Sequence, residues 1–185
     1  MGHPLPGVAV RVVGIEDGKL LAPGEDGLML VKGPNVMEGY LNDEEKTAEV
    51  LQDGWYQTGD VARLDEDGFI TITDRLSRFS KIGGEMVPHL KIEESIYQVV
   101  GSTKGENFSC VVTAVPDEKK GEKLVVLSTV ELDASDLKQR LSEVGLPNLW
   151  IPKQGSYIEV EEIPMLGSGK TDLKAVKGIA AKAFA

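Results

Sequence analysis

The chain is poor in the residues that build disulfides and transition-metal centres. It contains one cysteine, Cys110, and two histidines, His3 and His89, among 185 residues. A single cysteine cannot close an internal disulfide, and so few scattered ligands do not make a transition-metal site. Cys110 lies in the apolar run 109–112, so we expect a buried structural thiol rather than a nucleophile. A reducing, cytoplasmic compartment suits this cysteine usage.

The sequence also lacks long apolar segments and an excess of positive charge. No run of about 18 apolar residues is present, and the start, residues 1–4, shows no basic stretch followed by an apolar one. We therefore expect no membrane insertion by this segment and no secretory signal. Acidic residues outnumber basic ones by 30 to 20, for a formal net charge of −10. This balance argues against nucleic acid as a partner, because phosphate binding needs a basic face.

The residue pattern predicts an α+β fold in two parts, with the boundary after residue 74 and a hinge near residues 75–78. Residues 1–74 are expected to form a small β-rich subdomain, and residues 75–185 a mixed α/β domain. In the first part β-branched runs predict strands and an acidic N-terminal turn predicts one helix. The expected strands are 8–13, 28–33, 61–64 and 69–73, and the helix is 42–51.

In the second part helical and strand-like patterns alternate. Gly83–Gly84 is interpreted as a flexible or closely approached point of the backbone, and residues 116–122 as a loop. The other elements follow from the spacing of apolar residues. Helices are expected at 88–99, 134–144 and 172–184, and strands at 108–115, 123–130 and 157–160.

A glycine-rich loop near the C-terminus, residues 164–170, ends in Lys170. Gly167 and Gly169 allow such a loop to bend tightly over a ligand. The ammonium group of a lysine at its end could reach a phosphate or a developing oxyanion. An ordinary surface turn before a helix has the same composition, and on these residues alone it is the simpler interpretation.

Two further charged residues are candidates for binding. Asp60 ends the tight turn Thr58–Gly59–Asp60, and its carboxylate, which only accepts hydrogen bonds, suits the two hydroxyl donors of a cis-diol. Arg75 follows Asp74 at the end of a hairpin strand, where a guanidinium could bridge ribose and phosphate. When each residue is taken singly, a turn-capping aspartate and a surface Arg–Asp pair are the favoured interpretations.

The order of these motifs resembles the last third of the adenylate-forming enzymes. Residues 56–60, then Asp74–Arg75, then residues 164–170 follow one another as in the acyl- and aryl-CoA synthetases, luciferases and peptide-synthetase adenylation domains. The run 33–40 continues the match, which covers essentially the whole chain. Residues 78–87 are most similar to the bifunctional 2-acylglycerophosphoethanolamine acyltransferase/acyl-[acyl-carrier-protein] synthetases, with Glu85–Met86 as the discriminating detail.

The resemblance implies a distorted β-barrel subdomain followed by a mobile lid, and a two-step ligase reaction. ATP and a fatty acid react with Mg²⁺ to give an acyl-adenylate, and the thiol of an acyl-carrier protein, or of CoA, then takes the acyl group. In this scheme the implied residues are Asp60, Arg75 and Thr58 at the nucleotide, Lys170 for adenylation, Lys81 for the second step, Gly83 and Gly84 at the pantetheine tunnel, and Ser77 at the hinge. The family usually has Asp or Lys at the hinge, so Ser77 is a departure.

Several family motifs are missing from the chain: the phosphate loop, the segment that reaches Mg²⁺ and the acyltransferase motif. The resemblance therefore implies a piece of a longer enzyme, inactive alone, whose N-terminal remainder is its partner and supplies the Mg²⁺ ligand. The whole enzyme is expected in the cytoplasm, at the cytoplasmic face of the inner membrane.

Two alternatives stay open, a fatty acyl-CoA ligase and a noncatalytic module that binds a carrier protein or regulates a synthetase. Two basic clusters, Arg75 with Arg78 and Lys81, and Lys119 with Lys120 and Lys123, are candidate docks for an acidic carrier protein. For the second cluster a solubilising loop is the competing interpretation.

Overall fold

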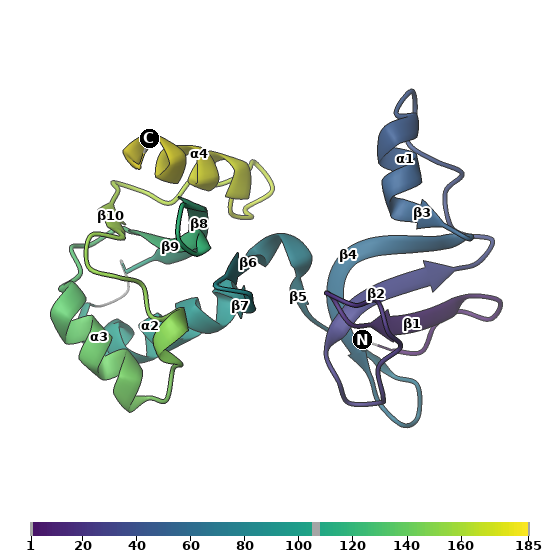
Figure 1. Ribbon diagram of the computed structural model, residues 1–185, viewed down its shortest axis with the longest axis horizontal. Coiled ribbons are helices and arrows are strands. Elements are labelled where there is room, and N and C mark those ends of the chain that lie inside the picture. The colour runs from purple at the N-terminus through teal and green to yellow at the C-terminus, as the bar shows by residue number, and fades with distance from the viewer. Residues whose placement is uncertain (1, 105–107, 185) are drawn as a thin grey trace. The chain divides into compact units, whose positions relative to one another are not determined.

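The computed structural model describes residues 2–104 and 108–184, and it divides into two compact units, Met1–Ser77 and Arg78–Ala185 (Figure 1). Helices and strands mix as the sequence predicts, and the α+β fold class is confirmed. The units meet after Ser77, within the range 75–78 that the sequence proposes as a hinge. Whether those residues act as a hinge stays a prediction.

The first unit is a curled antiparallel sheet with one short helix. Its strands lie in the order β1-β2-β4-β3, and β5 pairs with β4. The long strand β4 bends across the unit, as Figure 1 shows. Met29, Ala62 and Ile70 form its small core, so the sheet encloses few apolar side chains. The elements are β1 Ala9–Val13, β2 Gly27–Lys32, α1 Glu44–Val50, β3 Leu51–Gln52, β4 Trp55–Leu64 and β5 Ile70–Arg75.

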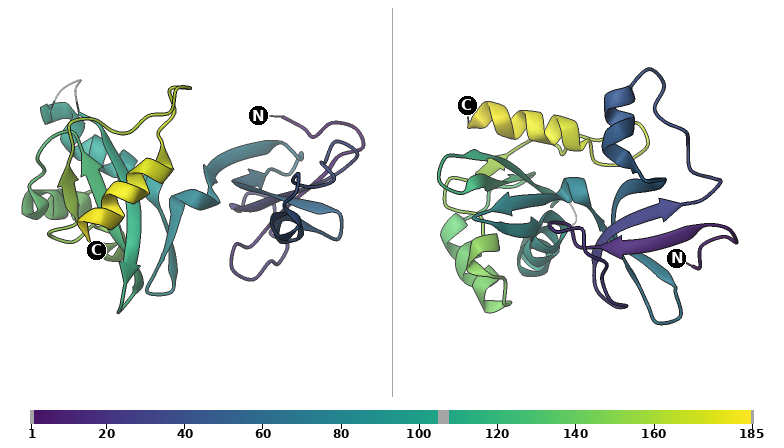
Figure 2. Two further views of the ribbon diagram at one scale, coloured as in Figure 1. Left: turned by 90° about the horizontal axis from the view of Figure 1, so that it is seen from above. Right: turned by 45° about the vertical axis from the view of Figure 1, so that its right-hand side comes forward.

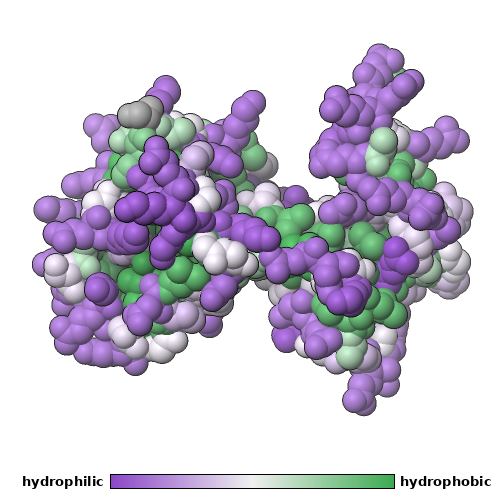
Figure 3. All heavy atoms as spheres, in the orientation of Figure 1, coloured by the Kyte–Doolittle hydropathy of each residue, from purple (hydrophilic) through white to green (hydrophobic). Residues whose placement is uncertain are grey.

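The helix α1 forms where the sequence predicts it. Asp43 caps its N-terminus, with Oδ1 accepting the N–H of Lys46 at 2.9 Å. Glu44 and Glu45 in the first turn are favourable beside the partial positive charge of the N-terminus. Only Val50 of this helix is buried, and hydrophilic side chains cover the helix in Figure 3. Local capping rather than a wide apolar face therefore defines α1.

The second unit is a mixed sheet with helices on both faces. Its strands lie in the order β10-β9-β6-β7, with β8 paired to β9, and only the β10–β9 pair is parallel. After a 3-10 turn at Leu76–Arg78, the elements are β6 Phe79–Ile82, β7 Glu85–Pro88, α2 His89–Lys104, β8 Cys110–Asp117, β9 Gly121–Ser128, α3 Ala134–Glu143, a 3-10 turn Asn148–Trp150, β10 Tyr157–Glu159 and α4 Leu173–Ala183.

Alternation along β8 and β9 explains why both faces of this sheet are covered. Val112 and Val126 pack with buried residues of α2 and α3, whereas their neighbours Val111 and Leu127 pack against α4. Successive side chains of a strand point to opposite faces, so an uninterrupted apolar strand needs a layer on each side. The three views in Figures 1 and 2 show α4 on the opposite face of the strands from α2 and α3.

Two sequence interpretations of the second unit are wrong. Gly83 and Gly84 form the two-residue turn of an unpredicted hairpin, β6–β7, with φ values of 59° and 92°. Both values lie in the left-handed region that glycine alone adopts freely, which suits a type I′ hairpin turn. No other heavy atom lies within 4 Å of either Cβ position, so turn geometry rather than close approach requires these glycines.

The expected loop 116–122 is the other error. Strand β8 runs through Asp117 and β9 starts at Gly121, so the two strands form one long hairpin. Asp117 Oδ1 accepts the backbone N–H groups of Lys119 and Lys120, at 3.0 and 2.9 Å, and holds the turn. The charged residues favoured the prediction of a loop. Charged residues are, however, also normal at the exposed end of a hairpin.

The helix that the sequence predicts from residue 88 begins one residue later. Pro88 closes β7, and α2 continues to Lys104, beyond the predicted end at 99. In the described part of the chain, no helix has the length and apolar character needed to cross a membrane.

Candidate functional site

The motif Thr58–Gly59–Asp60 forms a bulge in strand β4. Leu28 and Leu30 of β2 pair with Val61 and Gln57, so the motif's three residues lie opposite Met29 alone. The Thr58 hydroxyl closes the bulge: Oγ1 donates to the carbonyl oxygen of Met29 at 2.9 Å and accepts the N–H of Asp60 at 3.0 Å. The hydroxyl of Thr58 therefore shapes the backbone that carries Asp60.

Gly59 makes this bulge possible because its φ is 75°. An L-residue with a side chain adopts that conformation only at a cost. Bulges often redirect side chains at functional sites. Here the bulge precedes Asp60, the residue that the sequence proposes for a diol.

Asp60 and Arg75 are cross-strand neighbours on β4 and β5, and their side chains form an ion pair. Arg75 Nε lies 2.9 Å from Asp60 Oδ1, with exposed side-chain fractions of 69% for the arginine and 16% for the aspartate. The carboxylate is thus fixed in a partly buried position while most of the guanidinium faces solvent. The structure brings together two residues that lie well apart in the sequence.

A cavity of about 390 Å³ within the first unit is lined in part by Arg75 of this pair. Its walls come from α1, from the start of β4 and from Arg75, Leu76 and Ser77. Tyr40 and Tyr56 both line the cavity, and the hydrogen bond of Tyr56 with Tyr40, followed by burial, raises the pKa of the Tyr56 hydroxyl. Polar and apolar side chains line the cavity, and its charged groups are Lys46 and Glu49 as well as the largely exposed guanidinium of Arg75.

Lys170 lies on a tight turn that the backbone closes on itself. The N–H of Leu166 donates to the carbonyl oxygen of Lys170 at 2.7 Å, and that of Gly169 donates to Leu166 at 2.9 Å. Asp172 then caps α4 by accepting from the N–H groups of Lys174 and Ala175. The lysine is exposed, and its turn is attached directly to a capped helix.

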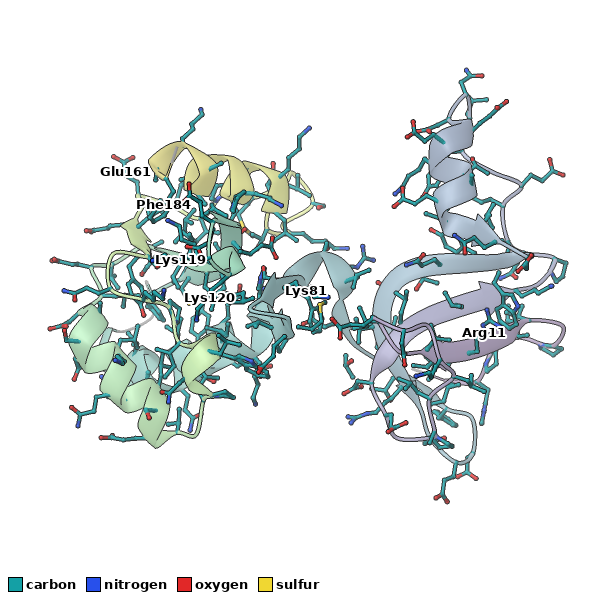
Figure 4. All side chains as sticks on the ribbon, viewed as in Figure 1. Arg11, Lys81, Lys119, Lys120, Glu161 and Phe184 are labelled. Atoms are coloured by element: carbon teal, nitrogen blue, oxygen red, sulfur yellow. The ribbon has the colours of Figure 1, made fainter. Side chains whose placement is uncertain are left out.

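Lys81 and the two glycines share the hairpin β6–β7 of the second unit. The N–H of Lys81 donates to Glu122 Oε2 at 2.7 Å, and the N–H of Gly83 donates to the carbonyl oxygen of Lys120 at 2.9 Å. These bonds join the hairpin to the β8–β9 turn. Figure 4 shows Lys81 on β6 and both Lys119 and Lys120 at that turn.

The residues of the first basic cluster belong to both units. Arg75 pairs with Asp60 in the first unit, and Arg78 pairs with Glu93 of α2 in the second. Sequence reasoning missed Glu93 entirely. The sequence position of Glu93 could have revealed it. Glu93 follows Ile92 and lies one helical turn before Ile96, on the buried face of α2. A charged residue on such a face needs a partner.

Comparisons with known proteins show which families the chain is similar to. The family model described as AMP-binding enzyme matches residues 1–41. The chain is 38% identical over 165 residues to a feruloyl-CoA synthase of Amycolatopsis sp, covering 87% of the chain and 32% of that protein. It is 36% identical over 179 residues to a long-chain-fatty-acid–CoA ligase of Bacillus subtilis (strain 168), covering 92% of the chain and 30% of the ligase. The chain therefore spans about a third of the length of these relatives.

Solved structures extend the likeness to the fold of the whole chain. ATP-bound MatB from Rhodopseudomonas palustris aligns with a TM-score of 0.80 at 28% identity, over 100% of this chain and 36% of MatB. These findings support the AMP-binding, adenylate-forming enzyme family. The apo structure of MatB aligns at a TM-score of 0.55 over the same coverage. The ATP-bound and apo MatB structures thus align differently with this chain.

The described residues of the chain contain no cluster of metal-ligating side chains. No group of three or more histidine, cysteine, aspartate or glutamate side chains could hold an ion in ranges 2–104 and 108–184. Cys110 is buried, and burial, with the nearby charge of Glu93, raises the pKa of its thiol to about 12. It therefore stays protonated, as expected for a structural cysteine.

Proposed function

We propose that the chain is the C-terminal part of an ATP-dependent acid–thiol ligase that activates a fatty acid as an acyl-adenylate and transfers it to a phosphopantetheine thiol. The observation that carries this proposal is the Asp60–Arg75 pair, which follows a β-bulge and whose arginine lines a cavity. The names of the related fatty-acid and feruloyl ligases support the reaction class.

The proposed nucleotide site uses the residues of the first unit. Asp60 presents acceptor oxygens to the two ribose hydroxyls, and its partly buried, anchored position reduces the entropy lost on binding. Arg75 directs its exposed guanidinium to phosphate or ribose oxygens. Thr58 acts indirectly, by fixing the bulge. The residues fit AMP or ATP, whereas Mg²⁺ finds no ligand set among the described residues, so we assign it to other parts of the longer enzyme.

The two lysines of the second unit are proposed to serve different steps. Lys170 neutralises negative charge that grows on the phosphate and carboxylate oxygens during adenylation, a contribution worth roughly 10²–10³-fold in rate. Lys81, on the hairpin with Gly83 and Gly84, serves the thiol-transfer step. A reorientation of the second unit at Ser77 would exchange the two lysines at the active site.

The thiol acceptor is proposed to be an acyl-carrier protein, in an enzyme that also carries a 2-acylglycerophosphoethanolamine acyltransferase activity. Glu85–Met86 supports this specificity, as do the lysines at positions 119, 120 and 123 on an acidic chain. The hydrogen bond between Gly83 and Lys120 keeps these lysines next to the proposed tunnel. The second candidate is a fatty acyl-CoA ligase, which the similarity to a long-chain-fatty-acid–CoA ligase favours. A noncatalytic module that binds carrier protein or regulates a synthetase is the third.

Thioester formation by the full-length enzyme tests the choice of acceptor. Acyl-carrier protein and CoA are compared at equal concentration, with purified enzyme, ATP and a radiolabelled fatty acid. We expect preference for the carrier protein, and a raised KM for it when Lys119, Lys120 and Lys123 are changed to glutamate. A matched triple change at exposed lysines 91, 138 and 182 controls for net charge. Preference for CoA, with no effect of the charge reversal, would replace the carrier-protein assignment by the CoA ligase.

The 185-residue chain alone should not catalyse ATP–pyrophosphate exchange. It carries only part of the proposed site, so we expect weak nucleotide binding without turnover. Exchange by the isolated chain would contradict the proposal that it is one part of a larger active site.

A further inference from the structure

Two ion pairs flank the junction of the two units. Arg75 pairs with Asp60 inside the first unit, and Arg78 pairs with Glu93 inside the second. Only Leu76 and Ser77 lie between these two arginines, and Ser77 is exposed. A side-chain contact therefore holds the backbone on each side of a very short stretch.

The Arg78–Glu93 contact is the buried one. Exposed side-chain fractions are 20% for Arg78 and 9% for Glu93, whose Oε2 accepts from Arg78 Nη2. The second oxygen, Oε1, accepts the backbone N–H of Val112 at 2.7 Å. Among the described strands β8 pairs only with β9, so this carboxylate covers an open strand edge. Glu93 thus joins the start of the second unit to α2 and β8 at once.

The surroundings leave Glu93 as the counter-charge of Arg78. His89 is buried, and its Nε2 lies 2.7 Å from Ser80 Oγ. Burial, and then the charges of Arg78 and Lys177, lower the pKa of His89 to about 4. The imidazole is therefore neutral at neutral pH and brings no second cation to the pair.

We propose that the ion pair of Arg78 with Glu93 fixes one end of the linker, which consists of Leu76 and Ser77. Arg78 and Glu93 confine rotation of the backbone to Leu76 and Ser77, and they thereby act as positioning residues for the reacting lysines of the second unit. The idea deepens the proposed alternation between adenylation and thiol transfer and rests on it. Small errors in orientation reduce rates strongly, so a reorienting unit benefits from a pivot of defined length.

Amide hydrogen exchange of the 185-residue chain tests the anchor directly. The paired change Arg78→Met with Glu93→Gln removes both charges and keeps an acceptor for the N–H of Val112. Because no buried charge is left without a partner, the second unit should stay folded. We expect exchange at residues 78–80 to rise at least about ten-fold, while Val112 and helix α3 change less than about two-fold.

The matched control removes an exposed ion pair from the same unit. Arg140→Met with Asp136→Asn eliminates a contact of 3.4 Å on α3, where the side chains are 33% and 62% exposed. It should leave exchange at 78–80 unchanged. Arg78→Lys, with Glu93 intact, should keep most of the protection against exchange at residues 78–80 that the paired variant loses.

Two outcomes would overturn the proposal. One is unchanged exchange at 78–80 in the paired variant, and the other is an equal rise throughout the second unit, which indicates general loss of stability. In the full-length enzyme the same variant should slow transfer from preformed acyl-adenylate at least about ten-fold in kcat, with little change in KM. A wild-type enzyme that forms no acyl-adenylate would contradict the proposed function, whereas the exchange experiment judges the anchor independently of it.

Discussion

Arg75 and Arg78 lie three positions apart, yet their ion pairs differ in burial and therefore in what they can do. The Asp60–Arg75 pair has a guanidinium that is 69% exposed, whereas Arg78 is 20% exposed and its partner Glu93 only 9%. An exposed pair contributes about 0–1 kcal/mol to stability. The exposed guanidinium of Arg75 can therefore rearrange around a ligand at little cost, while Asp60 stays in place.

A buried pair behaves differently when one partner is removed. The remaining charge loses its main counter-charge in a place with little access to water, and the loss is about 3–5 kcal/mol. Such a pair is poorly suited to exchange its partners for a ligand and well suited to hold elements together. The comparison therefore assigns binding to the arginine before the linker and anchoring to the one after it.

The single change Arg78→Met is expected to have the largest effect on stability. It leaves the carboxylate of Glu93 buried without its cation, so the second unit should lose about 3–5 kcal/mol. Urea unfolding followed by far-ultraviolet circular dichroism measures this loss. If Arg78→Met and Arg75→Met cost the same, burial does not distinguish the two pairs.

The second-largest expected effect is the change of unfolding free energy with pH that comes from His89. Its pKa in the folded chain is about 4, below the usual 6.5, so the unfolded chain binds a proton that the folded chain does not. The contribution of the neutral His89 imidazole to folding stability is fully present above pH 6.5. It decreases as the pH falls and is lost below about pH 4. The shift corresponds to about 3 kcal/mol.

Urea unfolding at several pH values between 7 and 4 measures this term. The difference in unfolding free energy between wild type and His89→Gln should shrink as the pH falls, because the neutral variant has no imidazole to protonate. A constant difference across this range would show that His89 is not held neutral beside Arg78.

Changes at the exposed pair should separate binding from stability. Asp60→Asn is isosteric, keeps an acceptor oxygen and removes the charge facing Arg75, so it should cost less than about 1 kcal/mol of stability. Calorimetry of AMP binding to the full-length enzyme should nevertheless show at least about ten-fold weaker affinity, as when a hydrogen-bonded charge is lost. A large stability loss with unchanged affinity would reverse the roles assigned to the two arginines.

The smallest effect is expected at the exposed pair of α3. Removing the contact between Arg140 and Asp136 should change stability by no more than about 0.5 kcal/mol, the usual value for an i, i+4 pair. Thermal unfolding of the variant provides the baseline for the other measurements. A cost close to that of Arg78→Met would mean that exposure is not the deciding variable.

Much of the fold follows from local sequence signals. Strand β1 is a β-branched run, and helix α1 has its cap and acidic first turn in the expected order. The hairpin of β6 and β7 was missed because its turn, Gly83–Gly84, also fits a flexible loop. Only the paired strands distinguish the two.

The site was less predictable, because its key contacts join residues far apart in the sequence. Asp60 and Arg75 could be proposed by resemblance, but their contact depends on the register of β4 against β5. Arg78 and Lys81 look alike in a basic cluster. Their different surroundings depend on Glu93, whose approach requires the packing of α2 against β8.

ATP–pyrophosphate exchange by the full-length enzyme, with a fatty acid as substrate, tests the central claim most directly. Lys170→Ala should reduce the exchange rate by roughly 10²–10³-fold, and Lys174→Ala, an exposed neighbour on α4, should leave it unchanged. Equal exchange by wild type and Lys170→Ala would contradict the adenylation role of the glycine-rich turn, and with it the proposed division of work between the two units.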